Sequence, residues 1–225
     1  MVRYDPVNDP DWRLAKLCDR SGAAMLLDVG ANTGQFATRM LRAGIPSIVS
    51  FEPLSGPYAK LIGAARGYTQ WSVAPRCALG ATEGKVEMNI AGNSQSSSLL
   101  PMLRRHVEAL PNSAYTGTES VHVLRLDDFV ETSLAGYDGA FALKMDVQGF
   151  EGSVLDGAAR TLPRVRVIYT EMSLCPLYEG SPAFIDLYAR IVGLGFRCVG
   201  VTPGFIDRER WEVLQVDATF VAEGR

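Results

Sequence analysis

Short apolar runs alternate with amphipathic stretches along most of the chain. Apolar runs that stop at a glycine or a proline are typical of strands buried on both faces. The stretches between them carry apolar residues at helical spacing, and Gly44 is placed to end one such helix. This alternation predicts one mostly parallel sheet with helices on both faces. The expected strands are Ala24–Val29, Ser47–Phe51, a weaker one within Gln70–Leu79, Lys85–Ile90, Ser120–Leu126, Ala140–Val147, Val165–Met172, Phe196–Val201 and Trp211–Ala222. The expected helices are Asp9–Arg20, Thr33–Ala43, Ser55–Ala65, Leu99–Leu110, Gly152–Leu162 and Pro182–Gly195.

The end of the chain departs from this rhythm. The last two predicted strands are joined by a turn-rich stretch of only about ten residues, which is too short for a crossover helix. We therefore expect the last strand to run antiparallel to its neighbours.

Residues 92–119 form the one clear compositional shift. They begin with the small polar run Gly92–Ser98, and a turn-rich segment follows at Pro111–Glu119. A segment of this length in a compact domain is usually functional or disordered. We expect a lid that recognises the acceptor; the alternative is a disordered surface loop.

Composition narrows the class of protein. The chain has 225 residues, and its 47% hydrophobic and 21% charged residues are those of a folded globular chain. We expect a single domain over residues 1–225, with a helical extension at residues 1–23. The net charge of −3 gives no general attraction for nucleic acid or anionic lipid. The four cysteines have no metal-ligand spacing, which favours reduced thiols. The N-terminus lacks the apolar run of a signal peptide, and no run is long enough to span a membrane, so we expect a cytoplasmic protein.

A glycine-rich turn follows the first predicted strand, in the segment Asp28–Gly34. Such a turn lets a ligand approach the backbone, and the following helix offers free N–H groups. Asn32 stands where a dinucleotide-binding motif has its second glycine, which disfavours a pyrophosphate and therefore an NAD-dependent oxidoreductase. Asp28 suits a cationic amine, and Glu52, at the end of the second strand, suits two ribose hydroxyls. An amine, a carboxylate and a ribose without a phosphate describe S-adenosylmethionine.

The chain resembles the FkbM-type S-adenosylmethionine-dependent methyltransferases. Its residues 24–222 carry, in the order of that family, the motifs Leu26–Gly34, Phe51–Pro53, Leu126–Asp128, Leu143–Glu151 and Gln215–Phe220. The resemblance implies a Rossmann-like class I methyltransferase fold, with a seven-stranded sheet whose last strand is antiparallel. It also implies O-methylation, commonly of sugar or polyketide hydroxyls. Gln148 departs from the family, which often has Glu there. The expected cofactor contacts are Asp28, Gly30, Ala31, Asn32, Thr33, Gly34, Glu52, Pro53, Ala78 and Asp146.

The candidate base lies in the strand Ala140–Val147. Lys144 and Asp146 share one face of this strand, although a central parallel strand is normally apolar on both faces. A structural salt bridge of Lys144 with a neighbouring carboxylate, and helix capping by Asp146, would explain them. The functional interpretation places Asp146 at the carboxyl end of the strand, where open α/β sheets bind ligands. Methyl transfer needs the acceptor oxygen aligned and its proton accepted, and a carboxylate can do both.

Three residues are therefore candidate catalytic groups. Asp146 is the first choice, Glu171 at the end of the next strand is the alternative, and His106 in the 92–119 insert is the rival base. Asp146 and Glu171, with Asp127, also have the oxygen ligands that Mg²⁺ prefers, but no dedicated ligand spacing is present, so a metal is not favoured. The expected partner is a small-molecule or glycan hydroxyl, not nucleic acid, and a homodimer is left open. N-methylation of an amine or peptide, and an inactive cofactor-binding module, are the alternatives.

Overall fold

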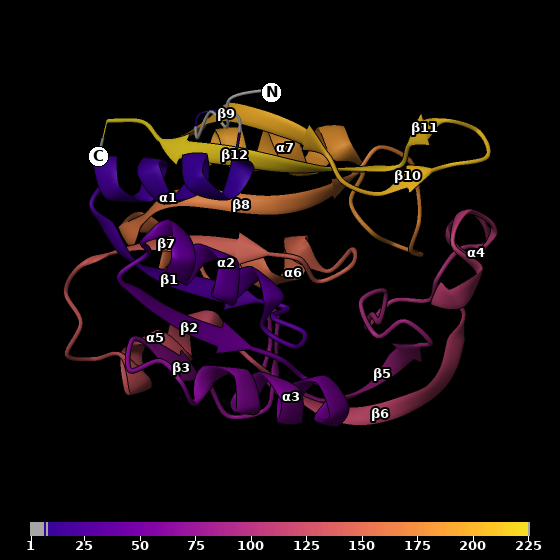
Figure 1. Cartoon of the computed structure of the whole chain (residues 1–225), viewed down its shortest axis with the longest axis horizontal. Coiled ribbons are helices and arrows are strands. Elements are labelled where there is room, and N and C mark those ends of the chain that lie inside the picture. Colours follow the sequence, from indigo (N-terminus) through magenta and orange to yellow (C-terminus); the bar gives the residue numbers. More distant parts are fainter. Residues whose placement is uncertain (1–6, 8, 225) are drawn as a thin grey trace, which may run out of the picture.

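A seven-stranded sheet forms the centre of the protein. The computed structural model describes residue 7 and residues 9–224, and the sheet has the order β3-β2-β1-β7-β8-β12-β9 (Figure 1). β12 pairs antiparallel with both β8 and β9, and the pairs among the other strands are parallel, which confirms the expected antiparallel last strand. The strands are β1 (Ala23–Val29), β2 (Ser47–Phe51), β3 (Trp71–Val73), β7 (Ala140–Met145), β8 (Val165–Ser173), β9 (Phe196–Pro203) and β12 (Gln215–Ala222).

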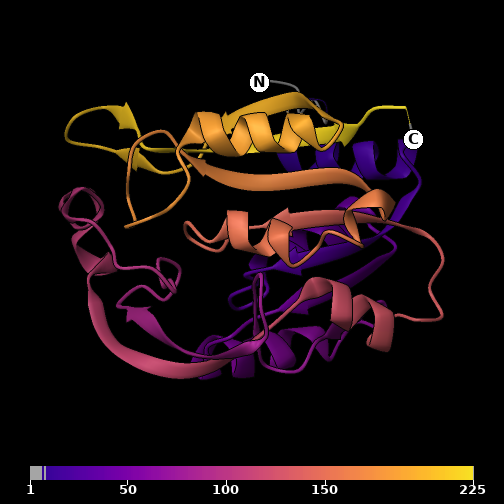
Figure 2. The same ribbon diagram turned by 180° about the vertical axis from the view of Figure 1, so that it is seen from behind.

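Helices cover both faces of this sheet. The first three, α1 (Pro10–Arg20), α2 (Gln35–Ala43) and α3 (Ser55–Ala65), lie on one face, and α5 (Leu126–Ser133), α6 (Glu151–Asp156) and α7 (Phe184–Gly193) lie on the other (Figures 1 and 2). Each layer has its own apolar core: Met40 and Leu61 pack with Ile48 on the first face, and Val154 and Ile191 pack with Leu143 on the second. The fold class expected from the sequence is therefore confirmed. The expected N-terminal extension is helical over α1, while residues 1–6 and 8 lie outside the described residues.

Two of the predicted strands do not join the main sheet. The region expected at Lys85–Ile90 is β5 (Gly84–Ala91), and the region expected at Ser120–Leu126 is β6 (Tyr115–Leu124). They pair antiparallel with each other and, with β4 (Ala78–Leu79), form a separate three-stranded sheet. The reason is local connectivity: β5 ends where the 92–119 insert begins, β6 starts within its last residues, and the two strands pair with each other. Their polar alternation suits a half-exposed arm.

Several helix boundaries also differ from the sequence prediction. The insert holds only the short helix α4 (Arg104–Ala109), followed by a 3-10 turn at Pro111–Ser113, because Pro101 and Pro111 bracket it. Leu126 starts helix α5 instead of ending a strand. The helix expected over Gly152–Leu162 ends at Asp156 and continues as turns to a 3-10 helix at Leu162–Arg164. The region Trp211–Ala222 divides into β11 (Glu212–Val213), which pairs with β10 (Ile206–Asp207), and β12.

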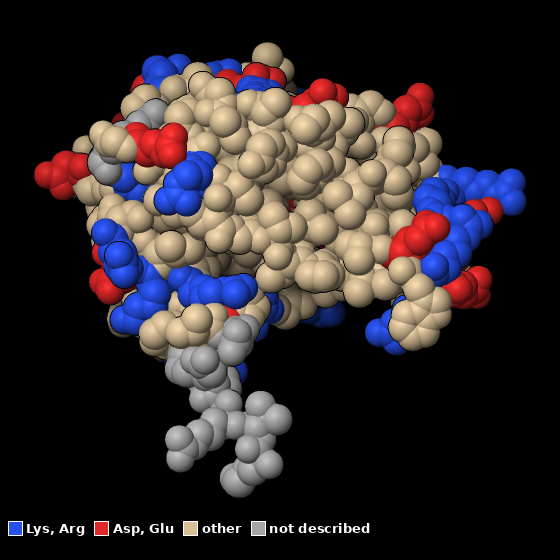
Figure 3. Space-filling view, turned by 90° about the horizontal axis from the view of Figure 1, so that it is seen from above, with Lys and Arg blue, Asp and Glu red and all other residues tan. Residues whose placement is uncertain are grey.

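Seen from above, the molecule carries both signs of charge toward its edges, while the middle of this face is largely uncharged (Figure 3). Among the helices of the described residues, none has the length and apolar character needed to cross a bilayer.

Candidate functional site

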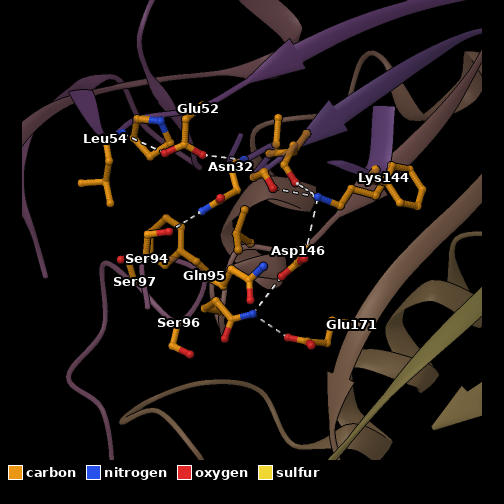
Figure 4. Close-up of a pocket in the computed structure, with 18 of the residues that line it drawn as sticks. Asn32, Glu52, Leu54, Ser94, Gln95, Ser96, Ser97, Lys144, Asp146 and Glu171 are labelled. Atoms are coloured by element: carbon orange, nitrogen blue, oxygen red, sulfur yellow. Dashed lines mark hydrogen bonds and ion pairs between the residues drawn. The ribbon is translucent and has the colours of Figure 1, made fainter. Parts of the chain in front are cut away.

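A pocket of about 390 Å³ opens at the carboxyl end of the main sheet. Its walls come from the ends of β1, β2, β7 and β8 and from the insert that precedes β6 (Figure 4). This is the edge at which open α/β sheets bind ligands. The insert thus contributes to the pocket wall, through Asn93 to Ser97, Leu99, His106 and Leu110.

The turn between β1 and α2 requires glycine at its first position. Gly30 has φ of +76°, and a Cβ atom there would lie 1.9 Å from the carbonyl oxygen of Asp146. The backbone N–H groups of Gly30 and Ala31 donate to the carbonyl of Phe51 at 3.1 and 2.9 Å. The ends of β1, β2 and β7 are therefore held together by close backbone contacts around Gly30.

Glu52 lies at the end of β2 with only 5% of its surface exposed. Its Oε2 accepts from the backbone N–H of Asn32 at 2.8 Å, and its Oε1 accepts from that of Leu54 at 2.9 Å. Burial raises the pKa of this carboxyl from 4.5 to about 7, although the two backbone donors act in the opposite direction. Glu52 therefore changes its charge near neutral pH while its orientation stays fixed.

Asp28 departs from the expectation that it contacts a ligand. Its side chain is fully buried beneath the pocket, and it does not belong to the pocket lining. The Nζ of Lys144 lies 3.1 Å from its Oδ1, and the hydroxyl of Ser50 donates to its Oδ2 at 3.0 Å. The physical reason is charge pairing: a buried carboxylate needs a partner, and Lys144 on the adjacent strand provides it.

Lys144 connects the floor of the pocket to the residues above it. Besides Asp28, its Nζ donates to the carbonyls of Val29 and Gly30 at 3.2 and 2.8 Å and lies 3.8 Å from Oδ2 of Asp146. Burial would lower the pKa of this amine, but the charges of Asp28 and Asp146 outweigh it and raise the pKa. The salt bridge considered for Lys144 in the sequence is present, and Lys144 stays charged.

Asp146 and Glu171 meet at the pocket wall through one amide. The side-chain nitrogen of Gln148 donates to Oδ1 of Asp146 and to Oε2 of Glu171, both at 2.8 Å. The Asp146 side chain is 43% exposed and points into the pocket, so it does not cap the next helix (Figure 4). Glu151, the first residue of α6, accepts from the N–H groups of Val147 and Gly149 in the preceding turn, at 3.1 and 3.3 Å, and so holds that turn.

Glu171 lies among other acids. Its Oε2 also accepts from the side chain of Gln215 at 2.7 Å, and Asp217 stands opposite it in the register of β8 and β12. Burial and the charges of Asp146, Glu151 and Asp217 raise its pKa well above the usual range. The two carboxyls joined by Gln148 therefore differ in their surroundings: Glu171 lies among other acids, while Asp146 has Lys144 beside it.

His106 lines the pocket but is 1% exposed. Its Nδ1 lies 2.9 Å from the hydroxyl of Ser113 and its Nε2 lies 3.2 Å from that of Tyr178. Burial lowers the pKa of the ring to about 4, so His106 is neutral at physiological pH. Both ring nitrogens are engaged by hydroxyl groups, which suits a positioning role better than that of a base.

The structure brings most of the residues singled out in the sequence into this one pocket. Those that line it are Gly30, Ala31, Asn32, Glu52, Pro53, Ala78, His106, Asp146 and Glu171. Three do not line it, namely Asp28, Thr33 and Gly34. Gly34 is the N-cap of α2, with φ of +88°, and a Cβ there would lie 2.5 Å from the Trp71 ring, so its role is local packing.

Asp127 is absent from this pocket. Its carboxylate is buried at the start of α5, where it accepts from the N–H and hydroxyl of Thr161 and pairs with Arg125. It therefore serves as an anchor within the fold, and the suggestion that it joins Asp146 and Glu171 around a metal is wrong. Within residues 7 and 9–224, no group of three or more His, Cys, Asp or Glu side chains is arranged to hold a metal ion.

Sequence reasoning missed Tyr169 as a pocket residue and gave Asp217 no role there. Both line the pocket, on β8 and β12, and burial raises the pKa of both side chains. The alternation of side chains along a strand could have identified Tyr169, because it lies two positions before Glu171 and so faces the same side of β8.

The comparisons with known proteins agree on a methyltransferase. Residues 28–198 match the family model "Methyltransferase FkbM domain". The chain is 32% identical over 178 residues to the 2-O-methyltransferase NoeI of Sinorhizobium fredii, covering 72% of this chain and 70% of the relative.

Solved structures agree in fold. A putative O-methyltransferase from Klebsiella pneumoniae aligns with a TM-score of 0.53 at 10% identity, over 98% of this chain and 83% of the other. The O-methyltransferase TomG from Streptomyces achromogenes, solved in complex with SAM, aligns with a TM-score of 0.51 at 10% identity, over 94% and 79%.

Proposed function

The chain belongs to the FkbM methyltransferase family, and we propose that it transfers the methyl group of S-adenosylmethionine to a hydroxyl of a sugar, glycolipid or polyketide-type product. The methyltransferase activity follows from the family. The acceptor and the residue roles are proposals that rest on the pocket. The observation that carries them is the Asp146 carboxylate, which projects into the pocket at the end of β7 with Lys144 beside it.

The donors and apolar groups of the pocket fit S-adenosylmethionine. Glu52 is fixed by two backbone donors and keeps lone pairs for the ribose hydroxyls. Cys77, Ala78 and Leu79 with Phe150 give an apolar wall suited to the adenine. Asp28, which was expected to hold the amine, lies below the pocket against Lys144 and does not line it. When bound, this cofactor supplies a methyl carbon already activated by its sulfonium.

In the proposed mechanism, Asp146 orients the acceptor hydroxyl and takes its proton. A general base must lie within hydrogen-bond reach of the proton, and Asp146 projects into the pocket with the Nζ of Lys144 3.8 Å from its Oδ2. Lys144 keeps its charge and stabilises the carboxylate form of Asp146. Glu171 is the alternative base, although its raised pKa means that it would first have to lose its own proton.

An uncharged hydroxyl acceptor suits the outer part of the pocket. Neutral His106, Phe205, Gln215 and Ser96 line it, and a sugar ring offers both polar edges for the amide and apolar C–H faces for the aromatic ring. The name of the Sinorhizobium relative, a 2-O-methyltransferase, supports oxygen as the acceptor atom. N-methylation of an amine or peptide uses the same cofactor residues and is the second candidate. The mild net charge of −3 favours neither nucleic acid nor anionic lipid as partner.

We propose direct proton transfer to a carboxylate, without a metal. Mg²⁺ would take Asp146 and Glu171 as oxygen ligands, but the Gln148 nitrogen lies 2.8 Å from an oxygen of each, where a bridging cation would have to sit. Turnover that persists in a chelator supports this proposal. Turnover that is lost and then restored by Mg²⁺ contradicts it.

Two measurements test the proposed function. Calorimetry with S-adenosylhomocysteine and with NAD should give binding of the first and none of the second. An assay with methyl-labelled S-adenosylmethionine against glycosides, polyketides and amines should transfer label to a hydroxyl. Cofactor binding with no transfer to any acceptor would instead support an inactive cofactor-binding module.

A further inference from the structure

Gln148 has an unusual backbone conformation that the insert holds in place. Its φ is +54°, in the left-handed region that costs a residue with a side chain about 1 kcal/mol or more. The hydroxyl of Ser98, at the end of the polar run of the insert, donates to the Gln148 carbonyl at 2.8 Å. At Gly149, the next residue, a Cβ would lie 3.2 Å from side-chain atoms of both Leu100 and Tyr178. The turn is thus packed directly against the insert.

Both the nitrogen and the oxygen of the Gln148 side-chain amide form hydrogen bonds. Its nitrogen donates to Asp146 and Glu171, and its Oε1 accepts from the hydroxyl of Tyr178 at 2.7 Å. These partners fix the orientation of the amide, because the two carboxyl oxygens need donors and the tyrosine hydroxyl supplies one. If the amide rotated by 180°, its oxygen would face two carboxyl groups.

Tyr178 connects this amide to the insert. It is 1% exposed and does not line the pocket, yet its hydroxyl lies 3.1 Å from the carbonyl of Ser96 and 3.2 Å from Nε2 of His106, both in the insert. Met102 of the insert also forms an isolated bridge with Tyr178. One buried hydroxyl therefore contacts the insert on one side and Gln148 on the other.

We propose that Gln148 is a positioning residue that couples docking of the 92–119 insert to the alignment of Asp146 and Glu171. Ser98 and Tyr178 hold Gln148, and Gln148 holds both carboxyls. Acceptor recognition by the insert and proton acceptance by the carboxyls then both depend on the hydrogen bonds that hold Gln148. This inference rests on the proposed function for its catalytic meaning, but the coupling itself is a property of the fold.

An amide suits this position because the surroundings already hold much negative charge. Asp217 from β12 and Glu151 from α6 stand near the two carboxyls, with Lys144 from β7 as the adjacent cation and His106 from α4 neutral. A donor without charge stabilises the ionised form of each carboxyl and adds no repulsion. Removing it should raise the pKa of the Asp146–Glu171 pair.

The test measures the titration of the two carboxyls by carbon-13 NMR in variants that leave Asp146 and Glu171 themselves unchanged. Gln148→Leu should raise the apparent pKa of the pair by about one pH unit, and Tyr178→Phe and Ser98→Ala by about half as much. Ser72→Ala, whose hydroxyl donates to the Ile48 carbonyl, and Tyr137→Phe, whose hydroxyl donates to the Ala140 carbonyl, are the matched controls and should leave it unchanged. Thermal unfolding checks that each variant is folded.

These readouts need no acceptor, so they separate this inference from the proposed function. If Gln148→Leu shifts the titration while Ser98→Ala and Tyr178→Phe behave as the controls do, the insert is not coupled to the carboxyls and the inference fails. No shift in Gln148→Leu removes the positioning role altogether. Where turnover is measurable, Tyr178→Phe should lower kcat by up to about tenfold with the cofactor Kd within twofold. Equal losses in Tyr137→Phe would mean a merely structural effect.

Discussion

The Nζ of Lys144 lies 3.1 Å from Oδ1 of Asp28, in a pair of side chains that are 3% and 0% exposed. This contact joins two adjacent parallel strands, β1 and β7, at the point where both end beneath the pocket. The contact gives Asp28, the acid of the glycine motif, a structural partner. It also places the Lys144 amine between the carboxylates of Asp28 and Asp146. The motif thus builds the floor of the site, and the residues above it face the ligand.

Breaking this pair should be costly. Lys144→Met leaves the Asp28 carboxylate buried without a cation, which we expect to lower the free energy of unfolding by about 3–5 kcal/mol in urea titration. The double variant Asp28→Asn with Lys144→Met removes both charges and should recover part of this loss. If Lys144→Met lowers the free energy of unfolding by less than about 1 kcal/mol, as expected for a surface ion pair, the buried pair does not stabilise the fold as described.

Gly30 should tolerate no side chain. In Gly30→Ala the Cβ atom would lie 1.9 Å from the Asp146 carbonyl oxygen at φ of +76°, so the strand ends must separate. We expect a loss of about 3 kcal/mol or more in unfolding free energy, together with loss of S-adenosylhomocysteine binding. Gly44→Ala is the matched control: its φ is +99° but nothing lies within 4 Å, so it should cost only about 1–2 kcal/mol and leave binding intact. Equal effects in both variants would mean that backbone strain alone is responsible.

Glu52 should link cofactor binding to pH. Its pKa of about 7 in the free protein means that near neutral pH a large part of the molecules carry this carboxyl protonated. Ribose hydroxyls favour the ionised form, so binding should release a proton and strengthen as the pH rises through 7. Calorimetry in buffers of different ionisation enthalpy measures this release. Glu52→Gln should remove it and weaken binding by about 10–100-fold, the range of one hydrogen bond to a charged group. Proton release that survives in Glu52→Gln belongs to another residue.

The stability of the free protein should decrease between about pH 4.5 and 7. Burial raises the pKa of Glu151 from 4.5 to about 7 in the folded state, so the folded form binds the proton more tightly. Its contribution is therefore complete below the unfolded pKa and is lost as the pH rises through the folded one. The loss amounts to about 3 kcal/mol for this group over that interval.

Glu151→Gln should make this part of the profile shallower, since glutamine keeps one acceptor for the Val147 and Gly149 donors and does not titrate. It should not flatten the profile, because Glu52 titrates over the same interval. Urea unfolding at several pH values gives the comparison. Parallel profiles for the parent and the variant would show that Glu151 does not titrate as described.

The sequence predicts the main sheet well because its strands are short apolar runs with clear stops. It predicts the pocket edge as well, since Gly30, Glu52 and Asp146 each end a strand, and parallel strands end at one edge. The separate sheet of β5 and β6 could not be predicted, because strand pairing depends on contacts between segments that local pattern does not specify. The pairing of Asp28 with Lys144 was considered only in general terms, since strand order determines which strands are neighbours.

The hydrogen bonds around Gln148 could not be predicted from the local sequence pattern either. Its partners Tyr178, Ser98 and Glu171 come from three distant segments, and only the fold brings them together. The sequence did mark Gln148 as a departure from a family that often has Glu there, and that departure now has a physical meaning, as an uncharged donor between two carboxyls.

The most direct test of the account is the transfer of labelled methyl groups to a panel of glycosides and polyketides by the parent protein and by Asp146→Asn. We expect the parent to label an acceptor oxygen. The variant should bind S-adenosylhomocysteine within a few-fold of the parent and lose turnover by about 10²–10⁴-fold, the usual contribution of a general base. Turnover in Asp146→Asn equal to that of the parent would contradict the assignment of Asp146, and label found on nitrogen in place of oxygen would contradict the proposed reaction.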